Sequence, residues 1–279
     1  MDTLKILIVS QKGGVGKSTL SANLAVWFSE KSFKQTLLID LDPHGSSSQW
    51  IENARSSNVL TQHYVPNEFG ERRWLIDSRQ KIRKNSHIAE VLISDLTWTS
   101  ALDAEFMHEF DLVIVPTSVS TIELSATNKF LENIRWVFES RTGIPPTLLL
   151  CPSRVTEREL LGDPFSKKDF PLPFLLLPPI VHDDSVRKLF KVNFIIDCNS
   201  PVKQSFMKCA SAIQNAGVIH KQAKSSIKLK LSERRVIDTH NTKLSRYMSK
   251  QTAKKDKQLI EKKKSFSGFS KLINSVLSK

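Results

Sequence analysis

Residues 11–19 bring two lysines, three glycines and two hydroxyl side chains into one short segment, which reads Gln-Lys-Gly-Gly-Val-Gly-Lys-Ser-Thr. Closely spaced glycines let the backbone bend tightly and point successive N–H groups inward. Lys17 adds a positive charge suited to the space between β- and γ-phosphates, and the Ser18 hydroxyl can ligate Mg²⁺. This combination is typical of a loop that binds the phosphates of a nucleotide.

The flanking segments predict the structure that such a loop requires. Residues 6–9 form an apolar run that predicts a buried strand, and residues 20–28 carry apolar side chains at helical spacing. A helix beginning near Lys17 would add its unpaired N–H groups and the positive end of its dipole. The candidate nucleotide-binding residues are therefore Gly13, Gly14, Val15, Gly16, Lys17, Ser18 and Thr19.

The early lysine of this loop carries a family resemblance. The string from Lys12 to Thr19 resembles the deviant Walker A motif, KGGxGK[ST]T, of the ParA/MinD superfamily of ATPases. The resemblance implies ATP and Mg²⁺ as ligands and a homodimer that sandwiches the nucleotide. It further implies that Lys12 reaches the phosphates of the partner's nucleotide and acts in catalysis, as an arginine finger does.

A second motif begins one strand later. Residues 36–40 form an apolar run that ends in Asp40, and Leu41-Asp42-Pro43-His44-Gly45 follows. This segment is similar to the family's DxDPQG, with His44 where glutamine is usual. The resemblance implies that Asp42 orients or activates the attacking water and that Asp40 supports the Mg²⁺ and water network, tasks suited to carboxylates beside a triphosphate.

A third acid follows a later apolar strand. Residues 91–95 end in Asp95, which matches the Walker B position, and another strand is expected at 111–115. The resemblance implies that Asp95 holds Mg²⁺ through water. The family usually has two prolines directly after this acid, but here Leu96 and Thr97 follow, which leaves the conformation of the next segment open.

The alternation of strands and helices predicts an α/β fold, with a mostly parallel twisted sheet covered by helices on both faces. Nucleotide is expected at the carboxyl ends of the strands. Strands are predicted at 4–9, 36–40, 62–65, 91–95, 111–115 and 147–151, with short ones near 174–177 and 194–196. Helices are predicted near 17–31, 45–54, 68–84, 100–109, 121–140, 183–191 and 201–215.

The resemblance, which covers about residues 1–217, extends to the base and to DNA. Pro178 and Pro179 match a segment that borders the adenine, and Arg154 matches an arginine near the base. In ParA proteins, basic residues in the following region contact DNA without sequence preference, although each is individually about as consistent with an ordinary surface charge. The corresponding residues here are Arg187, Lys188, Lys191, Lys203 and Lys208.

The net charge of +13 is unevenly distributed. Residues 221–279 contain 17 Lys and Arg against four Asp and Glu, whereas residues 1–220 contain 24 of each sign. We therefore predict an ATPase domain over 1–220 and a Lys-rich extension over 221–279. Such an extension indicates a polyanionic partner, either nucleic acid or anionic membrane.

The end of the extension has a pattern of its own. Over residues 264–279, apolar side chains recur at helical spacing beside lysines. A basic amphipathic helix of this kind suits an anionic membrane, as in the similar MinD branch, a protein partner, or docking back on the body.

Other features of the composition narrow the functional class. Cys151, Cys198 and Cys209 are too few and too scattered for a disulfide scaffold or a zinc site. No apolar run reaches the length of a membrane span, and the first residues lead directly into a strand, so no signal peptide is expected. These features favour a cytoplasmic location.

Three functional hypotheses follow from these observations. The first is a ParA-like ATPase, nucleoid-associated, that dimerises on ATP, binds non-specific DNA and drives partition or positioning of DNA or a protein cargo, with hydrolysis stimulated by a ParB-like or other adaptor. The second is a MinD-like positioning ATPase, peripheral on a membrane. The third is a nucleotide-binding scaffold of a conjugation or polar complex, which the His44 and Leu96-Thr97 departures keep open.

Overall fold

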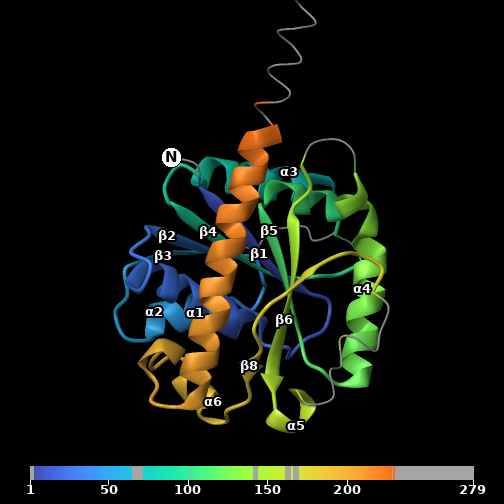
Figure 1. Ribbon diagram of the computed structural model, residues 1–279. Helices are drawn as coiled ribbons and strands as arrows, with labels where there is room; N and C mark the ends of the chain where they lie inside the picture. Colours follow the sequence, from blue (N-terminus) through green and yellow to red (C-terminus); the bar gives the residue numbers. More distant parts are fainter. Residues whose placement is uncertain are drawn as a thin grey trace, which may run out of the picture. The chain divides into compact units, whose positions relative to one another are not determined.

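Parallel strand pairing organises the described part of the chain (Figure 1). The computed structural model describes residues 3–64, 72–100, 102–140, 144–160, 165, 170–227 and 229. By its contacts the chain divides into two units, Met1–Gln222 and Ala223–Lys279, and the fold below is that of the first. The predicted helix over 264–279 lies outside the described residues.

The sheet has the order β3-β2-β4-β1-β5-β6-β7, with β8 paired separately to β6, and all pairs of strands are parallel. β1 lies at its centre between β4 and β5, so the loop after β1 is flanked by the ends of both neighbours. The strands are β1 Leu4–Ser10, β2 Thr36–Asp40, β3 Val59–His63, β4 Val91–Thr97, β5 Leu112–Thr117, β6 Thr147–Val155, β7 Leu175–Leu176 and β8 Ile180–Val181.

Helices connect the strands and cover the sheet. The α-helices are α1 Lys17–Glu30, α2 Ser46–Asn53, α3 Arg72–Asn85, α4 Thr121–Glu139, α5 Glu157–Leu160 and α6 Ser185–Leu189, and the 3₁₀ helices are η1 Ala104–Glu109 and η2 Ile195–Asp197. A further long helix begins at residue 201, and its residues within the first unit extend to 222. The alternation of strands and helices confirms the predicted fold class.

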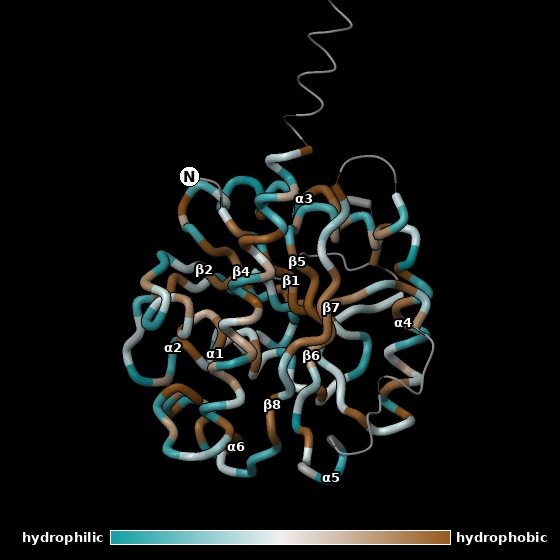
Figure 2. Tube along the Cα trace, viewed as in Figure 1, coloured by the Kyte–Doolittle hydropathy of each residue, from teal (hydrophilic) through white to brown (hydrophobic). Residues whose placement is uncertain are grey.

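Two hydrophobic cores lie on opposite faces of the sheet, because alternate strand residues point to opposite sides. On β1, Ile6 and Ile8 pack with α1, η2 and helix 201–222, whereas Leu7 and Val9 pack with α3, η1 and α4. Figure 1 shows these two layers of helices, and Figure 2 shows hydrophobic residues concentrated along the central strands. Both faces of the central strands are therefore buried.

Several predicted elements differ from the structure. The strand predicted at 62–65 is β3, which starts at Val59 because its five residues pair in register with β2. The strand predicted at 194–196 is wrong. That segment contains η2, whose Ile195 N–H donates to the Asn23 side chain on α1 at 2.7 Å instead of to a neighbouring strand. The expected helix at 100–109 is the shorter η1.

Other differences concern length. The helix predicted at 201–215 continues through the end of the first unit, and β8 and α5 were not predicted, since two- and four-residue elements leave no measurable periodicity. Residue 65 and residues 68–71 of the predicted elements lie outside the described residues. Among the helices that the structure describes, none is long and apolar enough to span a membrane.

Helix 201–222 belongs to the core through one buried stripe. Val202, Phe206, Cys209, Ala210 and Ile213 are all at most 2% exposed. Their i, i+4, i+7 spacing is that of a helix packed on a sheet.

We expect Ile213→Ala to lower the free energy of unfolding by about 2–5 kcal/mol, because it removes buried methyl groups and leaves a cavity. The control is Val218→Ala on the same helix, where the side chain is 50% exposed and the expected change is within about 0.5 kcal/mol. Urea unfolding followed by tryptophan fluorescence measures both. Equal effects of the two substitutions would contradict the packing described here.

Candidate functional site

The glycine loop connects the central strand to the most buried helix. Between Ser10 and Lys17 the backbone turns through two left-handed residues, Gly14 with φ of 76° and Gly16 with φ of 92°. Only glycine adopts such angles without strain. Gly16 is also the N-cap of α1, and a Cβ on either glycine would meet no atom within 4 Å, so the space above the loop is open. The predicted strand, loop and helix are present.

The charged groups of the three motifs meet at the carboxyl end of the sheet. Lys17, the first residue of α1, is only 7% exposed. Asp40 and Asp95 are register partners on the neighbouring strands β2 and β4, and both are fully buried. The structure therefore brings together one lysine and two carboxylates from segments up to 78 positions apart.

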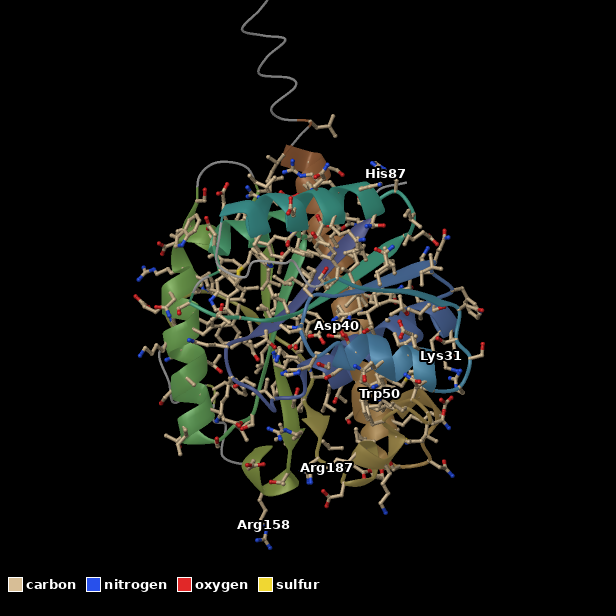
Figure 3. The ribbon with its side chains drawn as sticks, turned by 180° about the vertical axis from the view of Figure 1, so that it is seen from behind. Lys31, Asp40, Trp50, His87, Arg158 and Arg187 are labelled. Atoms are coloured by element: carbon tan, nitrogen blue, oxygen red, sulfur yellow. The ribbon has the colours of Figure 1, made fainter. Side chains whose placement is uncertain are left out.

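Asp40 is satisfied by the protein itself. Its Oδ2 accepts hydrogen bonds from the Ser47 N–H at 2.9 Å, the Ser47 hydroxyl at 2.7 Å and the Ser48 N–H at 2.9 Å, and its Oδ1 accepts from the Asp42 N–H at 3.0 Å. The carboxylate therefore holds the N-terminus of α2, where it also complements the helix dipole. Figure 3 shows Asp40 inside the fold next to α2. Its own contacts are thus with α2 and with the Asp42 backbone.

Asp95 is buried without such partners. Neither of its carboxylate oxygens has a hydrogen bond of good geometry from the described residues. Burial, together with the nearby Asp40 charge, raises the pKa of Asp95 to about 7, although the Ser18 hydroxyl, the Lys17 ammonium group and the Ser47 hydroxyl act in the opposite direction. A buried carboxylate in this state is stabilised by a cation or a proton. The oxygen donors of Asp95 and Ser18 fit a hard cation such as Mg²⁺.

Asp42 is held in place by neighbours from three segments. Its Oδ1 accepts from the His44 N–H at 3.0 Å, and its Oδ2 accepts from the Thr97 hydroxyl at the end of β4. The His63 ring contacts the Asp42 carbonyl oxygen at 2.9 Å. Leu96 and Thr97, which depart from the family's two prolines, therefore continue β4 and supply a donor to Asp42.

A cavity of about 540 Å³ opens beside the loop. Its wall includes Gly14, Gly16, Trp50, Arg154 and residues 180–183. Pro178 and Pro179 are not among its lining residues, because they precede β8, and the chain reaches the cavity only where Ile180 pairs with Ser153 of β6. Arg154 thus lines this cavity, whereas Pro178 and Pro179 do not.

Two further groups of predicted residues have distinct surroundings. Of the residues predicted to contact DNA, Arg187 on α6 also lines the cavity, whereas Lys188, Lys191 and Lys208 are exposed and Lys203 is half-buried. Figure 3 shows Arg187 near the end of the fold where α6 lies. Lys12 is 40% exposed, and its Nζ lies 3.2 Å from Glu123 Oε1.

Sequence reasoning missed three residues of this site: Ser47, Thr97 and Glu123. Ser47 follows the DxDPxG segment at the N-terminus of α2, and Glu123 follows Ser120 by three positions, the spacing of a helix start. These were available signals for helix caps, but no sequence signal indicates that Thr97 contacts Asp42. That contact depends on the pairing of β4 between β1 and β2.

The raised pKa of Asp95 predicts a pH-dependent effect of Asp95→Asn. In the native chain, without nucleotide and in EDTA, unfolding releases the Asp95 proton between the ordinary pKa of 3.8 and about 7, so stability falls as pH rises across this range. Asparagine has no proton to release, so the substitution removes this loss of stability with rising pH. We expect its stabilising effect to be roughly 2–3 kcal/mol larger at pH 8 than at pH 5, as measured by urea unfolding. An effect of the same size at both pH values would show that burial does not raise the pKa of the Asp95 carboxyl group.

Known proteins share this architecture. The chain is 40% identical over 122 residues to a maintenance of carboxysome distribution protein A from Gloeobacter kilaueensis, which is 43% of this chain and 51% of that protein. The chain spans 51% of the length of this protein and 64% of the length of the protein of the same name from Halothiobacillus neapolitanus.

Solved structures resemble the fold at lower identity. The septum site-determining protein MinD of Pyrococcus horikoshii, complexed with Mg-ADP, aligns with a TM-score of 0.59 and 21% identity, covering 78% of this chain and 98% of that one. The complex of a Cyanothece McdA variant with ATP aligns with a TM-score of 0.60 and 14% identity, covering 77% and 96%.

A family model describes the greater part of the chain. The model of the CobQ/CobB/MinD/ParA nucleotide binding domain matches residues 6–273, which include the glycine loop and both acidic motifs. Together with the strand order and the loop geometry, this match means that the chain belongs to the CobQ/CobB/MinD/ParA nucleotide-binding family.

Proposed function

We propose that this protein is an ATPase of the ParA/MinD type that binds ATP with Mg²⁺ at the glycine loop. The observation that carries the proposal is the buried Asp95 carboxylate, which has no hydrogen-bonding partner of good geometry in the described part of the chain and lies near Lys17 and Ser18. The Mg²⁺ ion that accompanies a bound triphosphate supplies the positive charge that this carboxylate lacks. The similar solved structures that are complexes with Mg-ADP and with ATP support the same ligand.

Each residue of the site has a proposed task. The loop N–H groups from Gly13 to Ser18 and the Lys17 ammonium group bind the β- and γ-phosphates. Ser18 and Asp95 hold Mg²⁺, directly and through water, and the bound ion adds charge stabilisation to the phosphoryl oxygens. Asp42 orients the attacking water. The His44 N–H and the Thr97 hydroxyl fix Asp42 by donating to its Oδ1 and Oδ2, respectively.

The cavity beside the loop suits the base and ribose. It extends from Gly14 and Gly16 to Arg154 and Arg187, with apolar walls from Trp50 and Val181. An aromatic and aliphatic pocket with a few polar groups is typical of a small-molecule site. We place the phosphates at its glycine end and the base toward Arg154.

Two copies of the chain are proposed to close over two nucleotides. Lys17 is nearly buried, whereas the side chain of Lys12 in the same loop is 40% exposed. A buried lysine can serve the nucleotide of its own subunit, and an exposed one can reach the nucleotide of a partner. Lys12 then stabilises charge on the transferring phosphoryl group from the opposite subunit.

Substitutions of the two lysines separate these roles. We expect Lys17→Ala to weaken binding of ATP by about tenfold to a hundredfold, since a charge-assisted contact contributes about 1.5–3 kcal/mol. Lys12→Ala is expected to leave binding by the single subunit nearly unchanged and to abolish dimerisation with a slowly hydrolysed ATP analogue. Calorimetry measures the first quantity and light scattering the second.

The matched control for these lysines is Lys31→Ala, an exposed lysine at the C-terminal end of α1. It is expected to change neither property. Loss of nucleotide binding in Lys12→Ala to the extent seen in Lys17→Ala would contradict a role across the interface. Phosphate release that persists in Asp42→Ala would contradict the role of Asp42, and native protein without phosphate release would leave only a nucleotide-binding scaffold.

The dimer is proposed to bind DNA without sequence preference and to position DNA or a protein cargo, with hydrolysis stimulated by an adaptor. Support comes from the excess charge of residues 221–279 and from the exposed lysines on and beside α6. The name of the Gloeobacter relative concerns distribution of carboxysomes, which favours a protein assembly as cargo. A location on the nucleoid would follow from such DNA binding.

Binding to duplex DNA should depend steeply on salt, because each lysine–phosphate contact releases counterions. We expect Lys188→Glu with Lys191→Glu to reduce affinity and to lower the slope of log affinity against log salt by about one for each lost contact. The control is Lys31→Glu. Mobility shifts at low and at moderate salt with the ATP analogue provide the measurement. Co-sedimentation with anionic liposomes in the absence of any DNA shift would instead favour the membrane-surface alternative.

A further inference from the structure

One carboxylate connects a cation of the glycine loop to a cation of β6. Glu123 lies in the first turn of α4, and its Oε1 is 3.2 Å from Lys12 Nζ and 3.7 Å from Arg154 Nη2. Lys12 belongs to the glycine loop after β1, and Arg154 belongs to β6 and lines the cavity. Three separate segments therefore depend on one side chain for the position of their charges.

The two cations are exposed to water, but the carboxylate is not. The Lys12 and Arg154 side chains are 40% and 42% exposed, whereas Glu123 is 15% exposed. Because the carboxylate has already lost most of its hydration, removing either cation leaves a poorly compensated charge. Glu123 therefore attracts Lys12 more strongly than an ordinary surface pair does.

Glu123 is nevertheless only partly satisfied. Its Oε2 is buried and has no hydrogen-bonding partner among the described residues. The carboxylate of Glu109, whose side chain is 8% exposed, accepts hydrogen bonds from Arg83 Nε at 2.9 Å and from Arg83 Nη2 at 2.6 Å. The Glu123 carboxylate is thus less fully hydrogen-bonded than that of Glu109. A strongly anionic group, such as the phosphates of a nucleotide, can therefore compete with Glu123 for Lys12.

Arg154 lies at an irregularity in the pairing of β6 with β8, between Ser153 and Val155. Arg154 has a φ of 58°, in the left-handed region that a residue with a Cβ adopts only at a cost. Its side chain faces Glu123, although the residue sits near the end of a parallel strand. The fold therefore bears strain at the residue that shares Glu123 with Lys12.

We propose that Glu123 is a positioning residue that holds Lys12 within its own subunit and opposes the departure of Lys12 toward a partner. The proposal rests on the proposed dimer for its consequence, because Lys12 must leave Glu123 before it reaches the other nucleotide. Arg154 stays paired with Glu123 when Lys12 leaves, so the carboxylate keeps one cationic partner. Glu123 then sets how much protein is required for the nucleotide-dependent dimer to form.

The test is Glu123→Gln. This substitution keeps the shape of the side chain and the hydrogen bond from the backbone N–H of residue 123 to Ser120 Oγ, and it removes the negative charge. The first readout is the rate at which acetic anhydride modifies Lys12 in nucleotide-free protein, followed by mass spectrometry of the Lys12 peptide. We expect this rate to rise about fivefold, the upper range for loss of an ion pair. Glu123→Asp, whose carboxylate is one methylene shorter, should raise it as well. The matched control is Glu132→Gln on the same helix, where the side chain is 60% exposed and lies 3.9 Å from Arg135.

The second readout is the dissociation constant of the dimer with a slowly hydrolysed ATP analogue, from sedimentation velocity. Since a symmetric dimer releases two lysines, the fivefold effect applies twice, and we expect Glu123→Gln to dimerise on the order of twentyfold more tightly. An unchanged modification rate would overturn the proposal, as would faster modification with an unchanged or weaker dimer. If the native chain and the Glu132→Gln control both stay single subunits, the proposed dimer fails, and the modification rate alone still decides whether Glu123 holds Lys12.

Discussion

Two carboxylates placed side by side, at the end of β2 and two residues before the end of β4, impose the main electrostatic constraint on this site. Asp40 and Asp95 are register partners with no exposure to solvent. Neighbouring buried carboxylates cannot both be ionised unless positive charge or hydrogen bonds compensate them. Asp40 is compensated by α2, and Asp95 has only the field of Lys17 and two nearby hydroxyl groups. One more positive charge would therefore stabilise the ionised Asp95 carboxylate, which lies beside an open glycine loop.

The same helix that satisfies Asp40 also forms part of the cavity. Trp50 on α2 lines the cavity and donates from Nε1 to the Asn193 carbonyl at 2.9 Å. Just beyond α2, Arg55 pairs with Glu30 and Asp197, each at 2.7 Å, and thereby connects α1 to η2. A rotation of α2 at its Asp40 end would consequently move the wall at its Trp50 end. One short helix thus connects the buried Asp40 carboxylate to the cavity wall at Trp50.

The sequence was sufficient to predict local features that are encoded within a few residues. The glycine loop, β1, β2 and α1 follow from patterns that each occupy fewer than 20 positions, and the structure contains them all. The errors arise where distant contacts decide the outcome. Residues 194–196 have strand-like composition, yet the Asn23 side chain on α1 captures the Ile195 N–H and the segment becomes η2. The lining of the cavity begins after Pro178 and Pro179 because the pairing of β8 with β6 determines which residues reach it.

The site contacts that sequence reasoning missed have the same origin. The Thr97 hydroxyl reaches Asp42 only because β4 extends two residues beyond Asp95, and Glu123 meets Lys12 across a separation of 111 positions. Neither relation produces a periodicity or a motif within one segment. The assignment of a residue to a strand or helix was therefore easier to predict than the identity of its partner.

Charge is divided between the two parts of the sequence in a way that is compatible with both proposed activities. Residues 1–220 have no formal net charge, and the whole excess of 13 positive charges lies in residues 221–279. Two neutral bodies can approach face to face without net repulsion, whereas a basic body would oppose dimerisation at low salt. A strongly basic segment outside the body can bind a polyanion and lose that affinity as salt rises. The charge that would bind a polyanion and the neutral part proposed to dimerise therefore lie in different parts of the sequence.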